Sequence, residues 1–172
     1  MEIRSVGLPT PSLIASAFPS IDFADAFRAD LPAGMPQEPD TLVRIFFGSA
    51  PSWIMWLMRL RNALVRPFGI GTDFGEAAIR SGGPLRPGEC VGPFRVFVVE
   101  NGEALMGLDD RHLDFRVSVL VRAGTVTVTT IVRRHNWFGR AYFAIVKPFH
   151  RLVVPALMRH GLRQWGRGGV KG

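Results

Sequence analysis

Residues 113–133 read LDFRVSVLVRAGTVTVTTIVR, and this stretch decides the fold. On both sides of Ala123-Gly124, apolar residues alternate with polar ones, which is the period of a β-strand with one buried face. The alternation predicts antiparallel strands over residues 113–122 and 125–133, joined by a short turn at the dipeptide.

The same pattern continues toward the N-terminus. Residues 94–100 and 103–108 flank Asn101-Gly102, a dipeptide that tolerates the positive φ angles of a type I′ turn. The sequence therefore predicts a second tight hairpin, and with it four consecutive antiparallel strands.

A long amphipathic helix is predicted after the strands, from Trp137 to about Trp165, with Asn136 as its cap. Pro148 and Pro155 fall toward its outer side and predict gentle kinks. A stripe of Arg140, Lys147 and Arg151 lies opposite a predicted apolar arc. We expect this arc to comprise Phe138, Tyr142, Ile145, Val146, Phe149, Leu152, Val153, Ala156 and His160.

The first part of the chain is less regular. Residues 21–31 suit either an edge strand or a short helix, because the periodicity does not decide between them. A short helix is predicted over residues 41–47, with Asp40 as its cap and Gly48 at its end. A second helix is predicted over residues 51–66, bounded by two prolines, and a long irregular connection over residues 69–93. The apolar face of the second helix is expected to comprise Trp53, Trp56, Leu57, Leu60 and Leu64.

The length of 172 residues favours one domain. We expect a loose lead-in over residues 1–20, a single domain over residues 21–165 and a flexible basic tail over residues 166–172. Cys90 is the one cysteine, so no internal disulfide can form, and a reducing, cytoplasmic location is expected. Charged residues interrupt the apolar stretches, so the protein is expected to be soluble or at most peripheral to a membrane, and not transmembrane.

Charge is distributed unevenly. The formal net charge is +7, and after Asp114 the chain has no carboxylate side chain but eleven basic ones. This asymmetry favours an anionic partner, such as an anionic surface that contacts the basic C-terminal region. The alternative is that the arginines only keep a small protein soluble.

The predicted order is a first strand, two shorter helices, a run of antiparallel strands and a long C-terminal helix. This is an α+β domain whose curved sheet must wrap around the last helix, because no other element is long enough to cover its apolar face. The order resembles the helix-grip fold of the START, polyketide-cyclase and birch-pollen-allergen superfamily. That resemblance implies a hydrophobic cavity between sheet and helix.

Three segments carry a closer resemblance. They are Gly107 to Arg116 (GLDDRHLDFR), His135 to Arg140 (HNWFGR) and Lys147 to His150 (KPFH). They are similar to an uncharacterised bacterial family of unknown function, over about residues 21–160. Its members occur alone or behind an NAD(P)-binding reductase domain, which implies a reductase partner. Gly69 to Gly75 does not form a dinucleotide fingerprint, because its last spacing is wrong and it follows a helix.

His112, Asp114 and Arg116 are predicted to share one face of a strand. There a carboxylate could orient a histidine and a guanidinium could bind an anion. The simpler interpretation is a solvated outer face with an Asp–Arg pair of little energetic value. Asp109 and Asp110 suit a turn.

On the long helix, His150 and His160 lie ten residues apart, which is not a zinc spacing, so no metal is expected. A hydrogen-bonded core histidine is the simpler interpretation. The helix-grip resemblance implies that Tyr142, Val146, Phe149 and Val153 line the cavity.

The leading hypothesis is a non-enzymatic module that binds an apolar small molecule, with or without an anionic head, and needs no cofactor. A cofactor-independent cyclase or hydrolase is the alternative, with His112, Asp114 or His150 as proton carriers, although no residue is assigned a catalytic role. Electrostatic binding to an anionic membrane or to nucleic acid ranks third. Nucleic acid is disfavoured because the aromatic residues are assigned inward.

Overall fold

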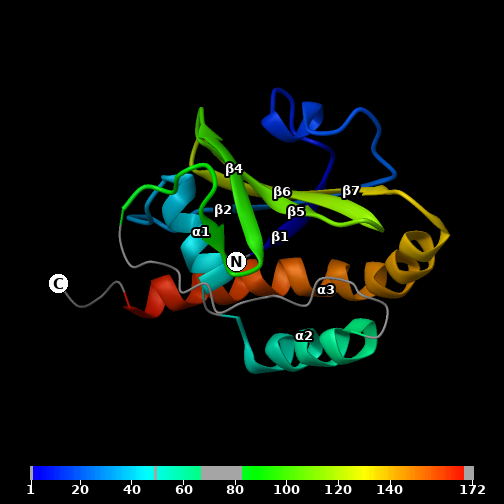
Figure 1. Cartoon of the computed structure of the whole chain (residues 1–172). Coiled ribbons are helices and arrows are strands. Elements are labelled where there is room, and N and C mark those ends of the chain that lie inside the picture. The colour runs from blue at the N-terminus through cyan, green and yellow to red at the C-terminus, as the bar shows by residue number, and fades with distance from the viewer. Residues whose placement is uncertain (1, 49, 67–82, 169–172) are drawn as a thin grey trace.

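The computed structural model describes residues 2–48, 50–66 and 83–168. These residues form seven strands, one short 3-10 helix (η1) and three α-helices (Figure 1). The strands are β1 (Ile3–Val6), β2 (Phe23–Asp30), β3 (Cys90–Val91), β4 (Phe94–Glu100), β5 (Glu103–Asp109), β6 (Leu113–Arg122) and β7 (Thr125–Arg134). The helices are η1 (Leu13–Ser16), α1 (Pro39–Gly48), α2 (Ser52–Val65) and α3 (Trp137–Gly168).

All seven strands pair antiparallel in one sheet, in the order β1-β2-β7-β6-β5-β4-β3. The four consecutive strands β4 to β7 are confirmed. Both predicted turns are confirmed as well, since Asn101 and Gly102 have φ angles of 52° and 76°, and Ala123 and Gly124 have 50° and 72°. These positive φ values match the twist of the flanking strands.

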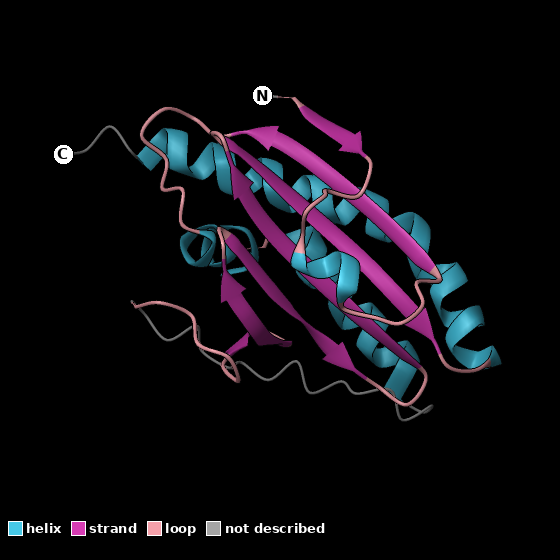
Figure 2. Ribbon diagram, turned by 90° about the horizontal axis from the view of Figure 1, so that it is seen from above, coloured by secondary structure: helices cyan, strands magenta, loops and turns pink. Residues whose placement is uncertain are grey.

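The curved sheet lies over α3, with α1 and α2 following β2 in the chain (Figures 1 and 2). This confirms the predicted α+β architecture, in which a curved antiparallel sheet covers a long C-terminal helix. None of the helices in the described ranges combines the length and apolar composition that crossing a bilayer requires.

The main core lies between the inner face of the sheet and the helices α1 and α3. Its fully buried side chains include Leu42 and Phe46 of α1, Val119 of β6 and Met158 of α3. The helices meet at Gly161, where a β-carbon would lie 2.7 Å from a ring carbon of Phe46. The absence of a side chain there allows α1 and α3 to approach closely.

The outer face of the sheet is covered by the N-terminal segment, which differs from the loose lead-in expected for residues 1–20. Ile14 and Phe18 of this segment are buried against Leu105 and Ile131 of the sheet. β1 also pairs with β2, so the strand predicted within residues 21–31 is present but is not at the edge of the sheet.

A buried carboxylate holds the N-terminal segment in place. Glu103 is 2% exposed, and its side chain accepts hydrogen bonds from the hydroxyl of Ser12 (2.6 Å), the backbone N–H of Leu13 (2.8 Å) and the hydroxyl of Ser118. Buried carboxylates are stable only when such donors replace water.

The predicted apolar arc of the long helix is wrong in its rotation. The buried positions of α3 are Gly139, Phe143, Val154, Met158, Gly161 and Leu162. Ile145 and Leu152, which belong to the predicted arc, are both 66% exposed. Large apolar side chains occur all around α3, so the period of 3.6 residues could not reveal which side faces the sheet.

The predicted docking face of α2 is also wrong. Among the side chains of α2 that the structure describes, Ile54 is the buried one, whereas Trp53, Trp56 and Leu60 are exposed. Leu64 of the predicted face lies outside the described side chains. For α1, Asp40 lies in the first turn and not at the cap, and its carboxylate accepts a hydrogen bond from the backbone N–H of Leu85 (2.9 Å).

Within the connection predicted for residues 69–93, the described part contains β3 and the buried Leu85. Residues 67–82 lie outside the described residues. The predicted tail begins inside α3, which continues to Gly168, and its last four residues are also outside the description.

Candidate functional site

The inner face of the sheet carries one polar cluster, which we call the Asp25 cluster: Asp25 of β2, Thr130 of β7 and His150 of α3. Asp25 and Thr130 are register partners, so their side chains lie next to each other on the same face. From α3, His150 reaches the sheet, and its Nε2 lies 3.3 Å from Oδ1 of Asp25. Three elements therefore bring these polar groups into the apolar layer between sheet and helix.

In the Asp25 cluster Thr130 is buried, and Asp25 and His150 are half-buried. The side chain of Asp25 is 10% exposed and that of His150 is 19% exposed, while Thr130 is 2% exposed. On β2 and β7 the residues in phase with the cluster are the pairs Phe27–Val128 and Ala29–Val126, which belong to the apolar core.

Two atoms of the Asp25 cluster lack partners. Oδ2 of Asp25 and Oγ1 of Thr130 are both inaccessible to solvent and have no hydrogen-bond partner among the described residues. A buried polar atom without a partner costs about 1–3 kcal/mol. Such atoms in a native protein call for an explanation, of which a bound molecule is one.

An aromatic ring and a cation border the Asp25 cluster. Phe23 lies two residues before Asp25 on the same strand face, and its ring is edge-on to that of His150, with centroids 6.3 Å apart. The ring centroids of Phe143 and Phe23 are 4.9 Å apart, and Nζ of Lys147 lies 5.2 Å from the centroid of the Phe23 ring. The site thus combines a carboxylate, a hydroxyl and an imidazole with an apolar wall and one ammonium group.

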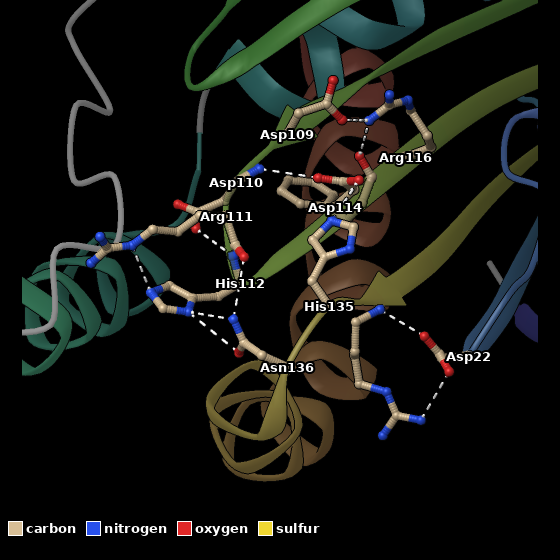
Figure 3. Close-up of polar contacts among 11 residues, drawn as sticks. Asp22, Asp109, Asp110, Arg111, His112, Asp114, Arg116, His135 and Asn136 are labelled. Atoms are coloured by element: carbon tan, nitrogen blue, oxygen red, sulfur yellow. Dashed lines mark hydrogen bonds and ion pairs between the residues drawn. The ribbon is translucent and has the colours of Figure 1, made fainter.

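A second polar group forms a corner where the connection between β5 and β6 meets the start of α3 (Figure 3). The backbone N–H of His135 donates to the carbonyl of His112 (2.9 Å), and Nδ2 of Asn136 donates to the carbonyl of Arg111 (3.3 Å). The side-chain oxygen of Asn136 accepts from the backbone N–H of Gly139 (2.9 Å), which confirms Asn136 as the helix cap. A β-carbon on Gly139 would lie 2.1 Å from the carbonyl oxygen of His112, so the two segments are in tight contact.

Two of the candidate site residues predicted on a strand, His112 and Asp114, belong to this corner and do not pair with each other. The ring of His112 contacts Asn136 and Arg111, while Asp114 places Oδ2 2.8 Å from Nε2 of His135. Oδ1 of Asp114 accepts from the backbone N–H of Asp110 (3.1 Å). The corner joins the segments that carry the GLDDRHLDFR and HNWFGR motifs. Its hydrogen bonds and the contact between Asp114 and His135 hold these two segments together.

Arg116 points to the outer face. It pairs with Asp109 (2.6 Å), and its guanidinium carbon lies 4.0 Å from the ring centroid of Phe97 and 4.8 Å from that of Phe18. The third candidate predicted on the strand, Arg116, is therefore enclosed by a carboxylate partner and by two aromatic rings.

A third pair links the end of β7 to the residue before β2. The backbone N–H of Arg134 donates to Oδ2 of Asp22 (2.6 Å), and its guanidinium lies 3.4 Å from Oδ1. The hydrogen bond from this backbone N–H lowers the pKa of the Asp22 carboxyl below its usual value of 3.8, against a smaller opposing effect of burial.

Of the helix candidates, only His150 joins the Asp25 cluster. The hydroxyl of Tyr142 accepts a hydrogen bond from Nε of Arg61 on α2 (2.7 Å), and Phe149 is 46% exposed. Val146 and Val153 are half-buried.

Asp25 and Thr130 were not among the predicted site residues, although the sequence carries a signal for each. Asp25 lies in phase with Phe23 and Phe27, and Thr130 lies in phase with Val128 and Val132. A polar residue in phase with an apolar strand face is the sign of a buried polar group.

No group of three or more histidine, cysteine, aspartate or glutamate side chains within residues 2–48, 50–66 and 83–168 is arranged to hold a metal ion. Such a group would be the minimum for a protein metal site.

Comparison with known proteins gives one match. Residues 17–157 match the model of a family described as a protein of unknown function, DUF2867. No curated protein and no solved structure matches the chain. The matched range includes the Asp25 cluster, the corner and most of the sheet, and the chain therefore belongs to the DUF2867 family.

Proposed function

We propose that the protein is a non-enzymatic small-molecule-binding module that holds a largely apolar compound between the sheet and α3. The observation that carries this proposal is the pair of unpartnered buried atoms, Oδ2 of Asp25 and Oγ1 of Thr130, on an otherwise apolar sheet face. A ligand with a polar end at the Asp25 cluster would satisfy both atoms and place its apolar part against the core.

The chemistry of the Asp25 cluster constrains the polar end of the ligand. A carboxylate oxygen accepts hydrogen bonds, and a threonine hydroxyl both donates and accepts. A hydroxyl or an amide on the ligand complements this pair, because it can donate to Asp25 and accept from Thr130. An anionic head would be repelled by the Asp25 carboxylate, so a neutral donor group is favoured over the anionic head expected from net charge.

The apolar part of the ligand has aromatic neighbours available. Phe47, Phe94 and Phe115 are half-buried side chains at the edge of the main core, and their rings meet edge to face, with centroids 5.6 and 5.4 Å apart. Half-buried aromatic rings provide large contact areas for an apolar compound. The order of elements is compatible with the helix-grip superfamily, whose ligands bind between sheet and helix, and we include membership of that superfamily in the proposal.

The test begins with native mass spectrometry of protein purified without added ligand, followed by a thermal-shift screen of apolar alcohols and amides. We expect a co-purifying mass or a compound that raises the melting temperature. For a compound that binds, Thr130→Val should weaken binding by roughly tenfold, the value of about one hydrogen bond.

Thr129→Val is the matched control. Thr129 is also fully buried with an unpartnered hydroxyl, but it faces the outer side of the sheet, where its register partner is Ser118. The variant removes the same atoms one residue away and should leave ligand binding unchanged. Equal loss of binding in both variants, or no hit across chemically diverse compounds, would contradict the proposal.

A second candidate function is supported by the contact between Asp25 and His150. A carboxylate that holds Nε2 of a histidine orients the ring toward a fixed position, which suits general acid–base chemistry. If a bound compound changes mass on incubation with the protein and His150→Gln abolishes the change while binding persists, the protein is a cofactor-independent enzyme. An unchanged mass favours the binding module.

A further inference from the structure

Exposed large apolar side chains are concentrated on two helices. Of the exposed large apolar residues in the described part of the chain, only Leu8 and Ile21 lie outside α2 and α3. The others form what we call the apolar helix surface, which consists of Trp53, Met55, Trp56, Leu60, Trp137, Ile145, Phe149 and Leu152. Eight exposed large apolar side chains gathered on two neighbouring helices favour an interaction site, which single scattered ones do not.

On α3, three residues of the apolar helix surface point away from the sheet. Ile145, Phe149 and Leu152 follow one another at spacings of four and three residues, so they share one side of the helix. That side is opposite to Val154 and Met158, which are buried in the core.

α2 extends this surface. Trp53, Trp56 and Leu60 lie on the side of α2 away from its buried residue, Ile54. In Figure 1, α2 lies on the opposite side of α3 from the sheet. The hydrogen bond between Arg61 of α2 and Tyr142 of α3 (2.7 Å) joins the two helices.

The charged residues of α2 and α3 are all basic. Neither α2 nor α3 contains an aspartate or a glutamate, and their exposed arginines include Arg59 and Arg159. Arg59 follows Trp56 at three residues and Arg159 follows Leu152 at seven, so each shares a side of its helix with the apolar helix surface. A partner must therefore combine apolar groups with negative charge. An anionic bilayer does so, because its phosphates lie a few ångströms above its hydrocarbon.

We propose that the apolar helix surface docks on an anionic membrane, with its tryptophans at the level of the lipid headgroups and its arginines on the phosphates. Tryptophan is enriched at this boundary because its ring is apolar and its N–H is polar. Arginine side chains bury their apolar stems and direct the guanidinium toward the phosphates. The protein lies on the membrane, and the docking does not depend on the small-molecule function proposed above.

The test is co-sedimentation of the full chain with vesicles of phosphatidylcholine alone and of phosphatidylcholine mixed with phosphatidylserine. We expect binding to the mixed vesicles that weakens as salt is added, since salt screens the attraction. Tryptophan emission should shift to the blue on binding, because Trp53, Trp56 and Trp137 are exposed in the free protein.

Two pairs of substitutions separate the apolar and the electrostatic contributions. Leu60→Ala with Leu152→Ala should weaken vesicle binding by roughly tenfold or more, because each leucine loses most of its buried apolar area. The matched control is Leu8→Ala with Ile21→Ala, which removes exposed apolar side chains elsewhere and should leave binding unchanged.

For charge, Arg59→Gln with Arg159→Gln should weaken binding by roughly 30-fold, about fivefold per arginine at the surface. The control, Arg4→Gln with Arg95→Gln, removes exposed arginines from β1 and β4 and should cost less than about threefold. All these side chains are exposed, so each variant should unfold at the same temperature as the wild type.

Three results would overturn the proposal. One is wild-type protein that binds neither kind of vesicle, which requires no variant. Another is loss of binding that is equal in the helix variants and their controls. The third is a wild-type dimer that Leu60→Ala with Leu152→Ala converts to monomer, because the apolar helix surface would then join two copies of this chain.

Discussion

Replacing Glu103 by glutamine should release the N-terminal segment from the outer face of the sheet. Glutamine has the same shape, and its one oxygen can still accept from the hydroxyls of Ser12 and Ser118. Its amide group then faces the backbone N–H of Leu13, so two donors meet and the 2.8 Å hydrogen bond is lost. A buried hydrogen bond to a charged group contributes about 1.5–3 kcal/mol, and we expect Glu103→Gln to lower the free energy of unfolding by about 2–3 kcal/mol.

For a chain of this size the melting temperature should fall by about 4–12 °C. Urea unfolding measures the free energy, and hydrogen exchange should show loss of protection at the amide of Leu13 and its neighbours in η1. Glu100→Gln is the matched control, since Glu100 is exposed at the end of β4 and should change stability by less than about 0.5 kcal/mol. If Glu103→Gln is as stable as this control, or if exchange in η1 is unaltered, the carboxylate does not hold the segment.

Two further predictions concern the corner and the start of β2. Gly139→Ala should destabilise the protein by about 3 kcal/mol or more in urea unfolding, because its β-carbon would lie 2.1 Å from the carbonyl oxygen of His112. Gly166→Ala, in open space on the same helix, should instead stabilise it by about 0.5–1 kcal/mol, and equal effects of the two would refute the argument. Asp22 has a lowered pKa, so it should stabilise the fold at pH values above its usual pKa of 3.8, and this contribution should be lost as pH falls through the lower folded-state value. Asp22→Asn should therefore be less stable than wild type at neutral pH, and the gap between their urea midpoints should close in acid; a gap that does not change with pH would contradict this.

The strands were predictable because their signals are local. Alternation of apolar and polar residues requires only the two-residue period of a strand, and positive φ at Asn101-Gly102 and Ala123-Gly124 depends on the turn residues themselves. The cap at Asn136 was predictable for the same reason, since its partner Gly139 is three residues away.

The candidate site was only partly predictable. His150 was identified as a candidate from the sequence, but its partner Asp25 is 125 residues earlier in the chain. The pairing of Asp114 with His135 instead of His112 likewise depends on how the ends of β6 and β7 meet. Sequence spacing gives the phase of each residue on its own element, and it does not give the distance between elements.

By itself, the sequence determined the α+β class, the order of the strands β4 to β7, the long C-terminal helix and the one-signed charge of the last third of the chain. All of these follow from local periodicity, turn chemistry and composition. Only the tertiary structure decided which side of α2 and α3 is buried, because both helices carry large apolar side chains on more than one side and burial depends on what lies opposite. The same docking placed His150 against Asp25 and left Trp56 and Leu152 facing outward. Both proposals depend on which side of these helices is buried. One places a ligand between the sheet and α3, and the other places a membrane against the outward sides of α2 and α3.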